Sequence, residues 1–239
     1  MRAKEFLSAR GVDYDSIDVT KQPERLDAAV ARFGIKALPL GIKGGRAINA
    51  QNLSDLASLI GETLDDTPVL SPEELVKRTD QFMAACQRYA RQFPAPLLHT
   101  MLPYRDWDYL KLVHHVFFVS HVFVNQMTGI GEGPAAAFEM PVPEDLTSFE
   151  AAARYGDTMR AELQAWWDAP GRIDFATVFK SRAGDRTAHQ VLERACWHVG
   201  QHVRQVEHMV KENGLTPDGP LTAALLDKLP LPKNVWSDL

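Results

Sequence analysis

Two histidines four residues apart, His198 and His202, are the residues of this sequence best placed to do chemistry. Residues at this spacing on a helix stand on one face, about one turn apart. Two imidazoles placed in this way can bind one divalent ion, each through a nitrogen about 2.0–2.1 Å from the metal. The same spacing also occurs on solvated helices, so its meaning depends on the surrounding residues.

Those surroundings predict a partly buried helix. Apolar residues flank the pair at helical spacing: Val191, Leu192, Ala195, Val199, Val206 and Met209. A buried imidazole needs partners for both ring nitrogens, and a metal supplies one while a carbonyl, carboxylate or water supplies the other. A third ligand must come from elsewhere, and the apolar segment 112–119 offers His114 and His115. Adjacent helical residues point about 100° apart, so only one of these two should face the site.

Two segments resemble the DinB-like superfamily. The run from His198 to Gln205, His-Val-Gly-Gln-His-Val-Arg-Gln, resembles its fourth-helix motif, and residues 112–117 resemble its histidine-bearing second helix. The resemblance covers about 165 residues. It implies a four-helix bundle, with a long crossing at residues 128–147. It also implies a metal held by His115, His198 and His202. His115 is preferred to His114 because its pattern with Val116, Phe117 and Phe123 is closer to family members, and His114 remains the alternative.

The residues near these histidines have less specific interpretations. Arg204 is the candidate catalytic residue, because it could bind a substrate carboxylate or thiolate; it could equally brace a neighbouring helix through a salt bridge. His121 is interpreted as a core residue or as support for a ligand. Cys196 is interpreted as an inert buried thiol. His189 and His208 are expected at the surface or at caps, and Trp166, Trp167 and Trp197 in the core.

Four long helices are predicted to position the site. The first begins at Ser71-Pro72, a capping residue followed by proline at the first helical position, and runs to about residue 93. The others are expected at 107–127, 148–167 and 187–213, and no strand is expected after residue 50. The proline-rich tail 229–236 should extend along the bundle, with Trp236 as its anchor.

The first 62 residues predict a second, smaller domain. We expect a helix at 2–9, a strand at 14–19, a helix at 23–33, a hairpin turning at Gly44-Gly45, and a last helix capped by Asn52. This order resembles a glutaredoxin or thioredoxin-like domain. In that family the proline at the position of Pro39 is cis and faces the thiols, so the resemblance implies a thiol-binding region at Pro39.

The catalytic cysteines of that family are missing from this sequence. A strand and a CxxC motif precede the first helix in the family, whereas no cysteine occurs here before Cys86. Dithiol exchange by this domain is therefore excluded, because the thiolate nucleophile is absent. Three interpretations stay open: the sequence is truncated at its start, the domain is kept for docking or thiol recognition, or it is only a packing appendage.

Composition narrows the class of protein further. The formal net charge is only -5, and no long run of like charges suggests a nucleic-acid or membrane surface. The two cysteines lie far apart, which fits a reducing cytoplasm. No signal segment is expected, and the apolar run 116–124 is too short to span a bilayer. We therefore expect a multidomain α/β plus all-α protein: 1–62 thioredoxin-like, 63–71 linker and 72–239 DinB-like bundle.

Three neutral ligands would leave a divalent ion with an open position, as in catalytic sites. The expected function is a metal-dependent enzyme that activates a glutathione-like thiol or water for S-transfer, isomerisation or detoxification. The expected cofactor is Zn, Ni or Fe, with glutathione as a possible co-substrate, and the expected partners are a small molecule and a second copy of the chain. The alternative is a metal-stabilised stress-response or partner-binding protein without turnover.

Overall fold

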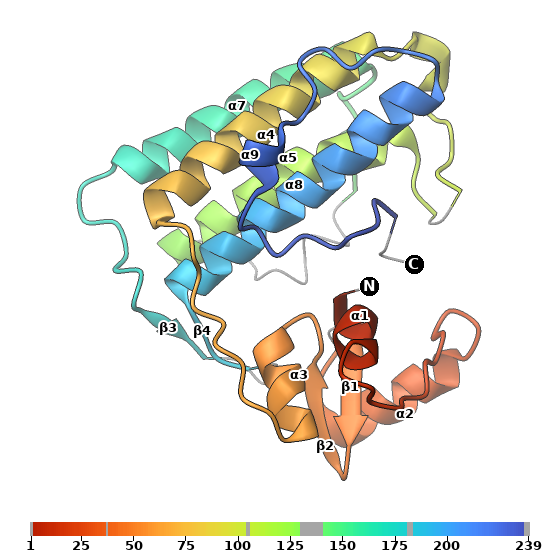
Figure 1. Cartoon of the computed structure of the whole chain (residues 1–239). Coiled ribbons are helices and arrows are strands. Elements are labelled where there is room, and N and C mark those ends of the chain that lie inside the picture. The colour runs from red at the N-terminus through yellow and green to blue at the C-terminus, as the bar shows by residue number, and fades with distance from the viewer. Residues whose placement is uncertain (1, 37, 104–105, 130–140, 181–183, 237–239) are drawn as a thin grey trace. The chain divides into compact units, whose positions relative to one another are not determined.

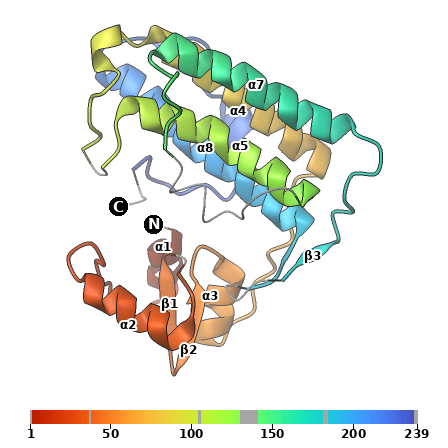
Figure 2. The same cartoon turned by 180° about the vertical axis from the view of Figure 1, so that it is seen from behind.

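The computed structural model describes residues 2–36, 38–103, 106–129, 141–180 and 184–236 (Figures 1 and 2). These residues form a mostly helical structure with small two-stranded antiparallel sheets. The chain divides into two compact units. Unit 1 runs to Thr67 and includes the segment Val178–Thr187, and unit 2 contains Pro68–Thr177 and the chain from Ala188 onward. No helix of the described residues has the length and apolar character needed to cross a membrane.

Unit 1 contains α1 (Arg2–Ser8), α2 (Pro23–Phe33), β1 (Leu40–Lys43), β2 (Arg46–Asn49) and α3 (Leu53–Ile60). The hairpin turns at Gly44-Gly45 as predicted, both with positive φ. Asn52 caps α3 by accepting hydrogen bonds from the backbone N–H groups of Ser54 and Asp55. A small apolar core holds these elements together: Ala3, Phe6, Ala50, Leu56, Ala57 and Leu59.

The strand predicted at residues 14–19 is wrong. Residues 12–18 form neither helix nor strand, and the segment ends in a turn where Asp18 Oδ1 accepts from the Thr20 N–H at 3.0 Å. Tyr14 and Ile17 are exposed. A strand needs a neighbouring edge and a buried face, and this aspartate-rich segment has neither.

Two short strands also appear where none was expected. β3 (Val178–Phe179) pairs antiparallel with β4 (Arg186–Thr187), and this hairpin belongs to unit 1. An ion pair between Arg186 and Asp55 of α3 links it to the rest of the unit. Strands of two residues are too short to show the apolar alternation by which a strand is recognised in sequence.

Unit 2 contains four long helices: α4 (Pro72–Gln92), α5 (Tyr109–Thr128), α7 (Phe149–Asp168) and α8 (Ala188–Glu212). Their predicted bounds are confirmed to within about two residues. Ser71 caps α4 through its hydroxyl group, as predicted, and Ser148 caps α7 in the same way. Asp108 caps α5 by accepting from the Lys111 N–H at 2.8 Å, and this cap was not predicted from the sequence.

The four helices lie side by side, with α4 and α5 each packed against both α7 and α8 (Figures 1 and 2). α5 and α8 run antiparallel, since Tyr109 near the start of α5 contacts Asn213 just after the end of α8. α5 and α7 run parallel, because His121 pairs with Glu162 and Phe123 packs on Trp166 further along both helices. Most of the predicted crossing between α5 and α7 lies outside the described residues.

Small residues permit two close approaches between these helices. A Cβ atom built on Gly200 of α8 would lie 2.9 Å from the Phe82 ring of α4, and one on Gly156 of α7 would lie 2.6 Å from the Phe117 ring of α5. Real Cβ atoms do not approach carbon atoms this closely. Glycine at these two positions therefore lets an aromatic ring lie directly against the neighbouring backbone.

Short elements complete unit 2: the 3-10 turn η1 (Ala95–Leu97) and the one-turn helix α9 (Ala223–Leu226). After α9 the tail runs alongside α8, as Figure 1 shows. The predicted packing of the tail along the helices is confirmed by hydrogen bonds from α8 side chains to tail carbonyls, described below. The Trp236 ring lies 5.9 Å from the His208 ring, measured between centroids.

Candidate metal centre

Three histidine rings from two distant parts of the chain meet between α5 and α8. The ring centroids of His115 and His202 lie 4.9 Å apart, those of His115 and His198 5.4 Å, and those of His198 and His202 4.8 Å. One ligating nitrogen of each ring lies within 4.8 Å of the other two. His115 and His202 are buried and His198 is half-buried. This cluster could hold a metal ion.

Helix geometry explains why these three rings meet. His198 and His202 lie one turn apart on α8, and the antiparallel packing of α5 brings His115 opposite them. Gly200 lies between the pair in sequence and faces Phe82, so α8 presents its histidines to α5 while its glycine packs on α4. The core of unit 2 thus fixes the rotation of α8 that the cluster requires.

The donor set fits a divalent transition metal. Imidazole nitrogens suit Zn, Ni and Fe, and two nitrogens bound to one tetrahedral ion at about 2.0–2.1 Å lie roughly 3.4 Å apart. The ligating nitrogens of the three histidines lie within 4.8 Å of one another, and small side-chain rotations would bring them to this spacing. Among the described residues, no fourth histidine, cysteine, aspartate or glutamate joins the group. The described part of the chain therefore offers three neutral ligands here.

An aromatic wall lines one side of the cluster. The Trp107 ring lies 4.8 Å from the His115 ring and 6.5 Å from the His202 ring, and the Lys111 ammonium lies 5.2 Å from the Trp107 centroid. Trp197 lies 5.8 Å from His198. Trp107 has no motif around it in the sequence, and no local signal would have assigned it to the site.

His202 is held in place by a neighbour on its own helix. Its Nδ1 lies 2.7 Å from Oε1 of Gln205, which is one turn further along α8. The amide nitrogen of Gln205 in turn donates to the Val235 carbonyl at 3.0 Å. The spacing of three residues from a ligand was the signal in the sequence that could have identified Gln205 as a ligand's partner.

Arg204, the candidate catalytic residue, contacts the tail. Its guanidinium donates to the Gln201 Oε1 at 2.8 Å, to the Pro232 carbonyl at 2.8 Å and to the Lys233 carbonyl at 3.2 Å. The predicted alternative, a bracing role, is closer to what the structure has, although the partners are tail carbonyls and not a carboxylate.

His114, the alternative ligand, faces a different helix from His115. Its ring lies 5.1 Å from the Tyr155 ring of α7 and is stacked on Phe118 at 5.5 Å. It is only 4% exposed, and its Nε2 has no hydrogen-bond partner. Burial lowers the pKa of His114 to about 4, so the ring is neutral at pH 7.

The other histidines lie apart from the cluster. His121 is held by Glu162 at 2.8 Å and by Asn125 at 2.9 Å, on the α5–α7 side. His189 bonds the Leu70 carbonyl near the start of α8, and His208 lies 3.2 Å from Glu212 near its end. These last two positions agree with the predicted cap and surface roles.

Neither cysteine is equipped to act as a nucleophile or a ligand. Cys86 and Cys196 are both fully buried. Burial raises the pKa of Cys196 to about 12 and raises that of Cys86 as well. Both thiols are therefore protonated at neutral pH, in line with the interpretation of Cys196 as inert.

Pro39, the predicted thiol-binding position, belongs to unit 1, and the histidines belong to unit 2. The Leu38–Pro39 peptide bond is cis, the isomer that the resemblance implied. Pro39 precedes β1 and is half-buried, and its carbonyl accepts from the Ala50 N–H at 2.8 Å.

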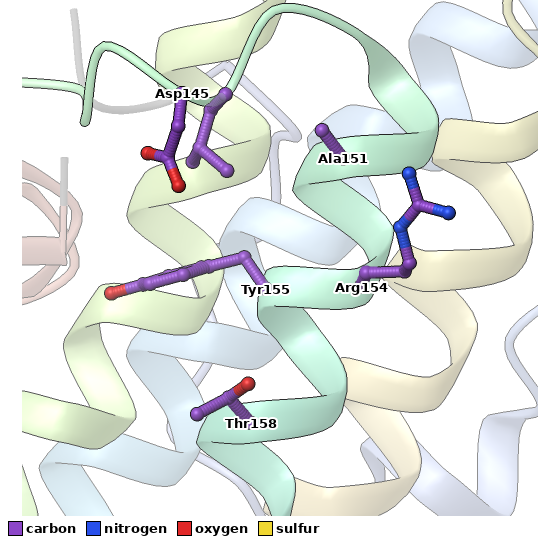
Figure 3. A pocket seen from close by; sticks show the side chains of 6 residues that line it. Asp145, Ala151, Arg154, Tyr155 and Thr158 are labelled. Carbon is purple, nitrogen blue, oxygen red and sulfur yellow. The ribbon is translucent and has the colours of Figure 1, made fainter.

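A surface groove of about 370 Å³ lies elsewhere on unit 2, along the first half of α7. Asp145, Leu146, Ala151, Arg154, Tyr155 and Thr158 line it. Figure 3 shows Arg154 and Tyr155 projecting from opposite sides of the helix. Because its polar side chains diverge and none of the three clustered histidines lines it, this groove is not the candidate site.

No protein-family model matches the chain, and no curated protein sequence matches it either.

Proposed function

We propose that unit 2 is a metal-dependent enzyme of the DinB-like type, with His115, His198 and His202 holding a divalent ion. The convergence of these three rings from α5 and α8 is the observation that carries the proposal. The four packed helices of unit 2 support the proposed DinB-like bundle, and the preceding α/β unit supports the proposed thioredoxin-like domain.

The chemistry of the donors favours catalysis over a purely structural ion. Structural zinc sites usually have four protein ligands, whereas catalytic sites have three and one open position. The described cluster provides three. A bound divalent ion would lower the pKa of a thiol or water that reaches it, so that the proton passes to solvent and a nucleophile forms at neutral pH.

The surrounding residues would orient the ligands and limit the access of water. Nδ1 of His202 lies 2.7 Å from Oε1 of Gln205, a contact that would fix the orientation of the His202 ring. Trp107 covers His115 and reaches His202. The proposed substrate is a glutathione-like thiol or water, and the proposed reaction is S-transfer, isomerisation or detoxification, in a cytoplasmic protein acting as a homodimer.

One observation favours a second candidate, a metal-stabilised partner-binding or stress-response protein. Arg204, the cation closest in sequence to the ligands, contacts tail carbonyls and so is committed to holding the tail. An arginine that holds backbone carbonyls has fewer donors left for a substrate anion. An Arg204 that does not bind substrate favours the partner-binding or stress-response protein over the enzyme.

Metal analysis of the untagged protein, followed by calorimetric titration with glutathione, tests the proposal. We expect close to one divalent ion per chain, with heat released on thiol addition only in the metal-loaded protein. Cobalt loaded in place of the native metal should change its visible spectrum when the thiol is added, which reports direct coordination. Bound metal without any thiol response would favour the second candidate, and a chain that binds no metal would refute both.

A further inference from the structure

The C-terminal tail is linked to a candidate metal ligand through a single glutamine. The Val235 carbonyl accepts hydrogen bonds from Nε2 of Gln205 at 3.0 Å and from Nε2 of Gln201 at 2.6 Å. Gln205 in turn meets Nδ1 of His202 at 2.7 Å. These contacts connect residue 235 to His202 across the surface of α8.

The direction of each hydrogen bond in this chain follows from Val235. A backbone carbonyl can only accept, so the NH₂ end of the Gln205 amide must face it. The carbonyl end of that amide must then face His202, and it too can only accept. Nδ1 of His202 must therefore carry the proton of the neutral ring, and the lone pair that can bind a metal lies on Nε2.

The tail that supplies this carbonyl is itself fixed by polar contacts to α8. Arg204 donates to the Pro232 and Lys233 carbonyls, and its guanidinium also donates to Oε1 of Gln201. Gln201 is 1% exposed and Gln205 is 1% exposed, so solvent does not compete for these amides. Buried hydrogen bonds of this kind are costly to leave unmade.

We propose that the C-terminal tail selects the tautomer of His202 through the amide of Gln205, and so prepares this ligand for the metal. Gln205 is then a positioning residue, and the Val235 carbonyl sets its orientation. The inference rests on the proposed metal site, which it deepens by coupling metal affinity to the docking of the tail. Coupling of this kind is reciprocal, so metal binding should also hold the tail more firmly.

The tautomer can be observed without any metal. Long-range ¹H–¹⁵N NMR correlations distinguish a protonated Nδ1 from a protonated Nε2 in a histidine ring. In the metal-free wild-type protein we expect His202 as the Nδ1–H form, with its signals assigned by comparison with His202→Asn. Observation of the Nε2–H form would overturn the proposal, whether or not the protein binds metal.

Substitutions of Gln205 separate its contact with His202 from its hydrogen bond to Val235. Gln205→Leu removes both hydrogen bonds and should weaken Zn²⁺ binding about 10–100-fold, the usual effect of losing a partner of a ligating histidine. Gln205→Glu retains an oxygen acceptor for His202 but cannot donate to Val235. It should bind Zn²⁺ at least as tightly as the wild type while loosening the tail. Gln164→Leu, on the exposed face of α7, is the matched control and should change neither property.

A double-mutant cycle tests the role of the tail itself. Gln201→Leu removes the other donor to Val235 without touching His202, and should weaken Zn²⁺ binding several-fold by letting the Gln205 amide turn. In the Gln205→Glu background the same change should have no further effect, because a carboxylate presents an acceptor in either orientation. Equal effects in the two backgrounds, or none in the wild-type background, would refute the tail's role.

Amide hydrogen exchange of residues 229–236 tests whether metal binding in turn holds the tail more firmly. Zn²⁺ should slow exchange of the tail in the wild type and fail to do so in Gln205→Glu. Wild-type protein that binds no Zn²⁺ would refute the proposed function alone, since the NMR measurement still decides the tautomer. Protein that binds Zn²⁺ equally well with Gln205→Leu would refute the present inference alone.

Discussion

The two sides of α5 carry adjacent histidines with opposite surroundings. His115 and His114 are each 4% exposed, so burial does not distinguish them. His115 meets two imidazoles from α8, whereas His114 meets the aromatic rings of Phe118 and Tyr155. The comparison shows that convergence with other donors, and not burial, marks a histidine as a candidate ligand.

The largest expected difference between the two sides is in metal affinity. His115→Ala should weaken Zn²⁺ binding by more than about 100-fold, beyond the loss expected for an outer partner, because it removes one of three direct ligands. His114→Ala should leave the affinity within a few-fold of the wild type. Competition with a chromophoric chelator measures both, and equal losses would mean that the α5–α7 side contributes to the site.

Bound metal should stabilise the folded protein through the histidines between α5 and α8. At a free Zn²⁺ concentration of 100 times Kd, the free energy of unfolding should rise by about 2.7 kcal/mol. Urea unfolding with Zn²⁺ and with excess chelator measures this difference. It should vanish in His115→Ala and persist in His114→Ala, and a stabilisation that survives His115→Ala would place the metal elsewhere.

A clash on the α5–α7 side should reduce stability without affecting the metal. In Gly156→Ala the new Cβ would lie 2.6–3.0 Å from three atoms of the Phe117 ring. Overpacking costs about 1–3 kcal/mol, offset by the roughly 1 kcal/mol that alanine gains over glycine in a helix, so we expect a net loss of at most about 2 kcal/mol.

Thr158→Ala, on the exposed side of the same helix, is the control for helix propensity and should not destabilise the chain. Thermal and urea unfolding report the two changes, while chelator competition should give wild-type Zn²⁺ affinity for both. Unchanged or higher stability of Gly156→Ala would show that the two helices can separate at no cost.

The smallest expected effect is a gain in stability at His114. His114→Leu replaces a buried ring that has an unsatisfied nitrogen with an apolar side chain, and should stabilise the protein by about 1 kcal/mol, since such a nitrogen costs about 1–3 kcal/mol. Urea unfolding without metal measures it. A marked loss of stability would show that the nitrogen of His114 makes an interaction that the leucine cannot replace.

Local signals in the sequence were sufficient for some of the helix starts. Ser71, Ser148 and Asn52 each act through a side chain and a backbone N–H only two or three residues away, so these caps can be read from neighbours in sequence. The pairing of His198 and His202 is equally local. Its prediction needed only the helical period.

Features that depend on distant residues could not be predicted in this way. α5 is apolar almost all round, so its periodicity does not fix which face meets α8, and the preference for His115 came from the resemblance. The role of Gln205 depends on a carbonyl 30 residues away. The segment 14–19 contains strand-favouring residues such as Tyr14 and Ile17, but among the described residues it has no neighbouring strand to pair with. A local pattern cannot show whether such a neighbour exists.

The hairpin Val178–Thr187 makes unit 1 discontinuous in sequence. The chain leaves this unit after Thr67, builds most of unit 2, returns to supply Arg186 as the partner of Asp55, and then resumes with α8. A fragment ending at Thr67 would leave the Asp55 carboxylate without its guanidinium, and the complementary fragment would carry a hairpin without its support. Insertion or duplication of the smaller unit as a single stretch of gene would therefore give an incomplete fold.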